Sequence, residues 1–259
     1  MIEVRSTGRR VADIDPSRLA LLDAGAAEAT TLTECLAVDF AVLMQSAFPD
    51  IGQNAIETMH QAKADGISRR MSLAGHLILE RYGMTALYDL QQHRSDTIRG
   101  WACFMIGAIG EKCLRERLIL IRPLADDHHF GVREWSWMAV RPHIASDLDN
   151  AIAQLAEWTS EPSERLRRFA SEATRPRGVW CSHIGALRRM PQKALAILAP
   201  LHDDAATYVQ DSVGNWLNDA SKDQPKWVRS ICSSWSAGEP TTATSRICKR
   251  ALRSIERKI

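Results

Sequence analysis

The chain has 259 residues, of which 45% are hydrophobic and 25% are charged, and its formal net charge is +2. This length is ample for a sizeable core, and no apolar run approaches a membrane span, so a membrane-embedded protein is excluded at this level. The beginning of the sequence has no apolar segment of the signal-peptide kind, and we expect a cytoplasmic protein without membrane contact.

The six cysteines are scattered and form no CxxC pair. Most of them fall inside apolar helical patterns, which is typical of reduced core thiols, so we expect neither a disulfide framework nor a zinc site. The sequence Asp126-Asp127-His128-His129 offers metal-binding side chains. Consecutive turn residues rarely converge on one ion, however, and we expect no metal and no organic cofactor.

Charge is unevenly spread along the chain. Residues 1–60 carry four Lys/Arg against nine Asp/Glu, whereas residues 163–190 carry seven against two and residues 222–259 carry nine against three. A basic second half indicates a face suited to an anion, such as a nucleic acid.

The first sixty residues predict helices after a polar lead-in over residues 1–15. From Ser17 to Ser46 the apolar residues recur at helical spacing, which predicts two helices with breaks near Gly25 and Pro49. Residues 51–63 predict another helix. Alternation with a period of two is almost absent along the whole chain, so the fold class is expected to be all-α.

An internal repeat follows. Four helical segments open on Ile98, Val132, Leu166 and Val209, and the spacings between them are 34, 34 and 43 residues. An arginine usually follows the aliphatic residue, and a second helical run that ends in an acidic or hydroxyl-bearing turn precedes each copy. Weaker copies open at residues 67 and 247. This pattern predicts HEAT-type repeats, and hence one α-solenoid domain over residues 1–259, its repeats covering about 61–259.

The repeated arginine, at Arg99 and Arg133, is typical of a link between neighbouring repeats through an acidic turn residue. Contact with a polyanion is the alternative at Arg133. The helical period also sorts the second helix of each repeat into a buried stripe and an open side. The residues expected on or beside the open side include Glu134, Trp137, Met138, Arg141, Arg168, Glu172, Arg175, Asn215, Asn218 and Asp219.

The gap between the third and fourth copies is nine residues longer than the others and contains the connection TRPRGVWCSHIG. Pro176 stops the helix, Gly178 allows a turn, and Trp180 is carried on that turn. Long connections inside compact repeats are often functional. Trp180 is therefore either a stacking residue or a plug over the next helix pair.

Two longer strings and one short one carry a family resemblance. Residues 167–180, RRFASEATRPRGVW, and residues 214–223, GNWLNDASKD, resemble the AlkC/AlkD-type DNA alkylation-repair glycosylases, closest to the AlkC branch, and REW at residues 133–135 agrees with them. The resemblance spans at least residues 95–255. One departure is Val179-Trp180-Cys181, since many relatives have a proline and a small residue around the tryptophan.

This resemblance implies a HEAT-like α-solenoid that holds duplex DNA on a basic concave face and hydrolyses the N-glycosidic bond of cationic alkylated bases such as 3-methyladenine. The matching acids, which would lie against the deoxyribose, are Glu134, Glu172 and Asp219. Arg168 and Trp180 match residues that line the lesion site. The full set of expected DNA-binding residues is Arg133, Trp137, Arg168, Arg175, Arg177, Trp180, Asn215 and Lys222.

The residue types agree with such chemistry. A cationic base departs as a neutral group, so the transition state needs an anion near the oxocarbenium-like sugar rather than a strong acid. Neighbouring arginines would hold phosphates and keep the carboxylates ionised by lowering their pKa. Carboxylates repel phosphate, so they would be a poor choice for plain binding.

Structural explanations of the same acids remain open, since Glu172 could simply pair with Arg168 or Arg175 at helical spacing. Two further functions also remain open, a module that binds branched or bent DNA without cutting it and a protein-binding scaffold. The expected partner is duplex DNA with alkylated bases, and a monomer is expected.

Overall fold

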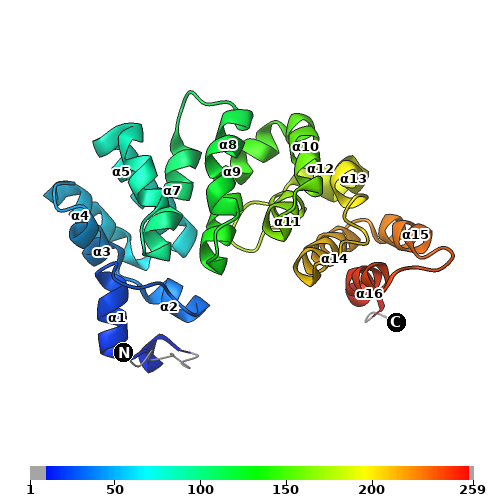
Figure 1. Cartoon of the computed structure of the whole chain (residues 1–259), viewed down its shortest axis with the longest axis horizontal. Helices are drawn as coiled ribbons and strands as arrows, with labels where there is room; N and C mark the ends of the chain where they lie inside the picture. Colours follow the sequence, from blue (N-terminus) through cyan, green and yellow to red (C-terminus); the bar gives the residue numbers. More distant parts are fainter. Residues whose placement is uncertain (1–9, 257–259) are drawn as a thin grey trace. The chain divides into compact units, whose positions relative to one another are not determined.

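The computed structural model describes residues 10–256 (Figure 1). Within these residues every regular element is helical, which confirms the all-α class. The polar lead-in expected over residues 1–15 lies largely outside the described part. The α-helices are α1 Pro16–Asp23, α2 Leu32–Ala37, α3 Phe40–Ala47, α4 Gln53–Gln61, α5 Ile67–Tyr82, α6 Leu87–Gln91, α7 Asp96–Ala108, α8 Leu114–Ala125, α9 Phe130–Ser146, α10 Leu148–Glu157, α11 Glu164–Ala173, α12 Gly185–Arg189, α13 Leu195–Leu198, α14 Thr207–Ser221, α15 Pro225–Trp235 and α16 Thr242–Glu256.

Two compact units make up the chain, Met1–Val140 and Arg141–Ile259, and helix α9 runs across their boundary. That the whole chain acts as a single domain stays a prediction, and so does a concave face built from both units. No helix in the described range 10–256 is long and apolar enough to cross a membrane.

The predicted repeat is confirmed as a series of helix pairs. Ile98, Val132, Leu166 and Val209 lie in the first turns of α7, α9, α11 and α14, and all four are buried. The weaker copies at residues 67 and 247 fall on α5 and α16. A helical repeat is therefore the organising unit of the fold, as the spacing of 34 residues indicates.

The repeated arginine ties each helix pair together. Arg99 donates to the carboxylate of Asp127 at 2.7 and 3.1 Å and to the carbonyl of His93 at 2.7 Å. Two repeats further on, Arg167 donates in the same way to the carboxylate of Asp204 at 2.6 and 3.0 Å. The link through an acidic turn residue is thus confirmed for these two arginines. Such two-pronged pairs fix geometry as well as adding stability.

In unit 1, α5 and α7 cross at very short range. A Cβ at Gly75 of α5 would come within 2.6 Å of the backbone nitrogen of Met105 on α7, so only glycine allows this approach. The helices bury Ile98, Trp101 and Met105 completely. Capping side chains set the helix starts nearby, since Asp39 accepts from the backbone nitrogens of Ala41 and Val42 at the beginning of α3.

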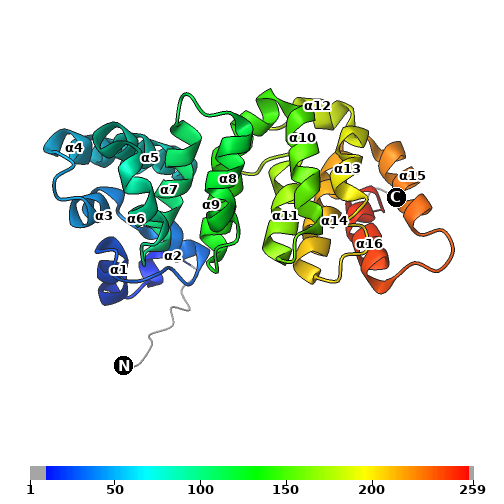
Figure 2. The ribbon, with the colours of Figure 1, turned by 45° about the horizontal axis from the view of Figure 1, so that its top comes forward.

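In unit 2, two rows of helices lie face to face. Figures 1 and 2 show α10, α13 and α15 in one row and α11, α14 and α16 in the other. Helix α14 packs against both α11 and α16. The indole of Trp216 is fully buried and donates to the carbonyl of Thr174 at 3.0 Å, so the middle of α14 is fastened to the end of α11.

Two sequence expectations were wrong about local structure. Residues 17–46 form three helices joined by loops, α1, α2 and α3, rather than two, because Thr31 and Asp39 each cap a new helix. Residues expected on the open side are buried instead, each with at most 7% of its surface exposed. These are Trp137, Met138, Arg141, Glu172, Asn218 and Asp219.

The cause of the second error is that a helix inside a repeat array is covered on several sides, so burial extends beyond one apolar stripe. The polar members of the set are compensated by bonds to protein groups. Arg141 donates to the carbonyls of Ala173 and Arg175, and Asn218 donates to the carbonyl of Ala251.

Candidate active site

Glu172 lies on the last turn of α11, in unit 2, with only 3% of its surface exposed. Its Oε1 accepts from Arg175 at 2.6 Å, and its Oε2 accepts from the hydroxyl of Ser212 at 2.7 Å. The guanidinium of Arg168 lies 3.6 Å from Oε2. A buried carboxylate with three such partners is held in one position.

Asp219 lies one helix away, on α14, and is 5% exposed. Its Oδ2 accepts from Nε and Nη2 of Arg175 at 2.9 and 2.6 Å, and its Oδ1 accepts from Nζ of Lys222 at 3.0 Å. Glu172 and Asp219 are therefore bridged by the single guanidinium of Arg175. The structure brings together five of the predicted site residues here, the acids Glu172 and Asp219 and the cations Arg168, Arg175 and Lys222.

The pKa values follow from this geometry. Burial alone raises the pKa of Glu172, but the charges of Arg168 and Arg175 and the hydrogen bond from Ser212 outweigh it, so the net pKa is lowered. Burial lowers the pKa of Arg175, and the two carboxylates more than reverse that effect. Glu172 is thus an ionised carboxylate at neutral pH, in agreement with the sequence-based expectation.

Arg141 fixes the backbone beneath this pair, and sequence reasoning missed it. Only 2% of its surface is exposed, and its guanidinium donates to the carbonyls of Ala173 at 2.8 Å, Arg175 at 2.6 Å and Ser182 at 3.2 Å. It therefore closes the end of α11 and the connection that follows. Its signal in the sequence was a charged residue at the edge of an apolar stripe, which does not by itself distinguish a buried arginine from an exposed one.

The connection predicted from TRPRGVWCSHIG is an irregular segment between α11 and α12. A Cβ at Gly178 would collide with the backbone carbonyl and sulfur of Cys181, so close approach rather than an unusual φ requires glycine there. Trp180 is 42% exposed on this segment and Val179 is 77% exposed. The exposure of the indole is compatible with the stacking role predicted for it.

Arg168 and Arg177 flank the pair in different ways. The guanidinium of Arg168 lies over the ring of Tyr208, 4.4 Å from its centroid, which limits its freedom. Arg177 shares the carboxylate of Asp223 with Arg188, at 2.9 and 2.8 Å. These ion pairs tie the connection after α11 to the end of α14.

Asn215 does not join the carboxylate pair. It also lies on α14, but its side-chain oxygen accepts from Arg250 and Arg253 of α16, each at 3.0 Å. On α14, Glu172 instead contacts Ser212, one turn earlier than Asn215.

Glu134, Arg133 and Trp137 belong to unit 1, on α9. The indole nitrogen of Trp137 donates to Oε2 of Glu134 at 3.0 Å, so the ring folds back along its own helix. Arg133 donates to the carbonyls of Asp127 and His128, both at 2.8 Å. That contact matches the structural role of the repeated arginine.

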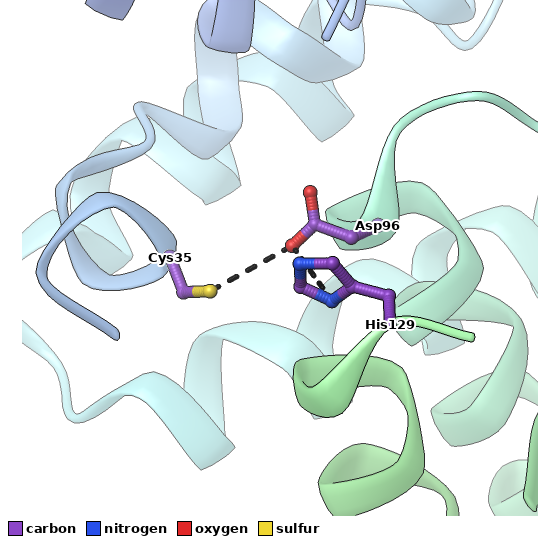
Figure 3. Close-up of side chains that lie close together, drawn as sticks. All are labelled: Cys35, Asp96 and His129. Carbon is purple, nitrogen blue, oxygen red and sulfur yellow. Dashed lines mark hydrogen bonds and ion pairs between the residues drawn. The ribbon is translucent and has the colours of Figure 1, made fainter. Parts of the chain in front are cut away.

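A second cluster of ionisable groups lies in unit 1 (Figure 3), where Cys35, Asp96 and His129 point toward one another. All three are buried, with the thiol 3.7 Å and the imidazole Nδ1 3.8 Å from Oδ2 of Asp96. Both ring nitrogens of His129 already have backbone partners, the carbonyl of Ala29 at 2.6 Å and the amide of Gly131 at 3.1 Å. The cluster therefore fastens the segment around Ala29 to α7 and α9.

Comparison with known proteins agrees with the resemblance in the sequence. Residues 132–246 match the family described as DNA alkylation repair enzyme. The protein YhaZ of Bacillus subtilis (strain 168) is 41% identical over 123 residues, which are 48% of this chain and 34% of that protein. The family match over residues 132–246 includes both Glu172 and Asp219.

Two solved structures share the fold. The Pseudomonas fluorescens alkylpurine DNA glycosylase AlkC, bound to DNA with an abasic site analogue, has a TM-score of 0.69 at 22% identity, covering 96% of this chain and 66% of that one. AlkD2 from Streptococcus mutans has a TM-score of 0.56 at 21% identity, covering 83% of this chain and 96% of that one. The predicted AlkC/AlkD-type resemblance and the helical-repeat fold are therefore confirmed. The chain spans about a third of YhaZ and 66% of the AlkC chain.

Proposed function

We propose that this chain, which resembles the AlkC/AlkD-type alkylation-repair proteins, is a DNA glycosylase that removes cationic N-alkylated bases such as 3-methyladenine from duplex DNA. It would act as a monofunctional hydrolase, as a monomer and without a metal or organic cofactor. The match of residues 132–246 to DNA alkylation repair enzymes supports this class of activity. The DNA in the AlkC structure supports DNA as the partner.

The observation that carries the proposal is the pair of buried carboxylates, Glu172 and Asp219, joined through Arg175. Glu172 lies in the most basic stretch of the chain, and two buried acids are costly unless their charge is used or neutralised. Arg175 neutralises part of that charge and holds both acids in fixed positions. Electrostatic catalysis requires such preorganised charges.

The two acids have different tasks in this proposal. Both oxygens of Glu172 accept hydrogen bonds, so Glu172 fixes Arg175 and adds negative charge beside that arginine. Among the described residues, Oδ1 of Asp219 has one side-chain donor, Lys222, whose side chain is 43% exposed. When Lys222 turns toward DNA, Oδ1 is released to face the sugar and to orient the attacking water.

The chemistry then needs few further groups. An alkylated purine carries positive charge and leaves as a neutral base, while the deoxyribose gains oxocarbenium character. Asp219 stabilises that charge, and the water adds to the anomeric carbon as the N-glycosidic bond breaks. Glu134 stays a prediction as a catalytic acid; it lies in unit 1, where its Oε2 accepts from the indole nitrogen of Trp137 at 3.0 Å.

The remaining predicted residues are proposed as contacts to DNA. Arg168, Arg177 and Lys222 would bind phosphates, and Trp180 would stack at the lesion. Asn215, Arg133 and Trp137 stay predictions as DNA contacts.

The proposal is tested by incubating the wild-type protein with methylated duplex DNA and measuring the release of 3-methyladenine. Binding to the same DNA is measured in parallel. Release above that of the heat-inactivated protein supports the glycosylase. Tight DNA binding without any base release would contradict it and favour a non-catalytic DNA-binding module instead.

A further inference from the structure

A basic cavity lies beside the carboxylate pair in unit 2. The ends of α14 and α16 and the beginning of α15 enclose a space of about 410 Å³. Three cations line it, Lys222, Lys226 and Arg229, together with the hydroxyls of Ser221 and Ser254. A cavity of this size falls in the range of small-molecule sites, and its polar lining has one sign of charge.

No described side chain compensates the charges of Lys226 and Arg229. Among residues 10–255, whose side chains are described, neither makes an ion pair or a hydrogen bond. Other arginines of unit 2 behave differently, since Arg167, Arg177 and Arg188 each pair with an aspartate. The cavity therefore brings together two cations that have no ion-pair partner among the described residues.

These two cations are also neighbours on one helix. Lys226 and Arg229 are three residues apart on α15, so they lie on the same face and repel each other. A cation at Lys222, at the end of α14, is favoured by the helix dipole and is ordinary. The positions of Lys226 and Arg229 on α15 have no such explanation, because both residues lie in the first half of that helix, where the dipole favours negative charge.

The rim of the cavity is held in place by Asn218. Its backbone carbonyl accepts from the hydroxyl of Ser221 at 2.8 Å, and its side-chain oxygen accepts from the hydroxyl of Ser254 at 3.2 Å. Its amide nitrogen donates to the carbonyl of Ala251 at 3.0 Å, which fastens α14 to α16. The lining hydroxyls thus have fixed positions before any ligand enters.

Lys222 links the cavity to the candidate active site. Its ammonium group lies 3.0 Å from Oδ1 of Asp219, and its side chain also lines the cavity. An anion in the cavity would compete with Asp219 for this cation. Occupation of the cavity and the exposure of Oδ1 are therefore coupled through one side chain.

We propose that this cavity binds one backbone phosphate of the DNA strand, through Lys226 and Arg229, and that the phosphate draws Lys222 away from Asp219. The inference rests on the proposed DNA glycosylase function, whose other contacts do not include Lys226 or Arg229. It assigns the cavity to a phosphodiester, which shares its chemistry with free inorganic phosphate.

The test is the salt dependence of binding to an undamaged duplex. Each phosphate contact contributes about 0.9 to the slope of log K against log salt. The double variant Lys226→Gln/Arg229→Gln should lower the magnitude of that slope by about 0.9 and weaken binding at low salt. The control Arg115→Gln/Lys193→Gln removes the same formal charge elsewhere, from α8 and from the turn before α13, and should keep the wild-type slope. An unchanged slope in the double variant would overturn the proposal.

Further arms separate the remaining explanations. Lys226→Arg/Arg229→Lys keeps both charges and should keep the wild-type slope. A reduced slope in this variant would mean that the charges at the cavity do not set the slope, and it would overturn the assignment. DNA binding is also measured while inorganic phosphate replaces chloride at equal ionic strength. Competition by phosphate in the wild type, combined with an unchanged DNA slope in the double variant, would assign the cavity to the free ion and reject the DNA contact. Base release is measured separately, so a changed slope without any release would reject the glycosylase and retain the subsite.

Discussion

Glu172 and Asp219 lie on different helices and are 47 residues apart, yet both accept hydrogen bonds from the guanidinium of Arg175. Arg175 follows the end of α11, where the backbone is held by Arg141. The geometry of the two acids therefore depends on one arginine beyond a helix terminus. The proposed chemistry depends on that geometry.

Replacing Arg175 by Gln should be strongly destabilising. The substitution leaves two buried carboxylates without their shared cation, and breaking a buried ion pair from one side costs about 3–5 kcal/mol. Chemical denaturation checks this, with Arg189→Ala on α12 as the control, because Arg189 is exposed and should change stability by less than about 0.5 kcal/mol. Equal stability of Arg175→Gln and wild type would mean that the carboxylate pair does not need its bridge.

Glu172 should make stability depend on pH in the acid range. Its pKa is lowered below the ordinary value of 4.5 in the folded protein, so its stabilising effect is complete above about pH 4.5 and is lost as the pH falls through the lowered pKa. Glu172→Gln should be less stable at neutral pH and should lose less stability on acidification. Urea midpoints measured between about pH 3 and pH 7 would show this. Parallel curves for the variant and wild type would contradict the ion pairing of Glu172.

The repeated arginine should contribute to stability rather than to DNA binding. Arg167→Ala removes the two-pronged pair with Asp204 and the bonds to the carbonyls of Glu161 and Pro162. We expect a loss of about 2–4 kcal/mol, measured by thermal or chemical unfolding, together with little change in the salt slope of DNA binding. A stable variant with a reduced salt slope would assign Arg167 to DNA instead.

The cysteines should differ sharply in reactivity. Burial raises the pKa of the Cys35 and Cys103 thiols, with Asp96 adding to the effect at Cys35, whereas Cys113 is exposed at the beginning of α8. Brief treatment of the folded protein with iodoacetamide, followed by peptide mass mapping, should modify Cys113 and spare Cys35 and Cys103. The denatured protein serves as the control, since all six cysteines should then react. Rapid modification of Cys35 in the folded state would contradict its burial beside Asp96.

The repeats could be predicted because their signal is periodic. The spacing of 34 residues and the arginine after each aliphatic residue follow from one packing arrangement used several times, and Arg99 and Arg167 confirm it. Glu172 could be selected because an acid is unusual in a basic stretch, and both Glu172 and Asp219 could be selected because their surroundings resemble a family. The lowered pKa of Glu172 also agrees with the expectation from neighbouring arginines.

What the sequence could not give was the closeness of particular side chains. Helical periodicity treats each helix as having one buried side, so it placed Trp137 and Arg141 on an open side although both are buried. It could not find the bridging role of Arg175, because that depends on how α11 and α14 pack. Lys226 and Arg229 belong to the basic run at residues 222–259, but their shared cavity and their lack of partners among the described residues are visible only in the folded unit.

The most direct test of the account is the rate of 3-methyladenine release under single-turnover conditions by wild type, Asp219→Asn and Asp223→Asn. Asp223 lies near the same end of α14 but pairs with Arg177 and Arg188, so it is the matched control. We expect release by wild type and by Asp223→Asn. Asp219→Asn should retain DNA binding but release the base more slowly, by a factor of about 10² to 10³. Equal rates for Asp219→Asn and wild type would contradict the claim that this carboxylate stabilises the cationic sugar.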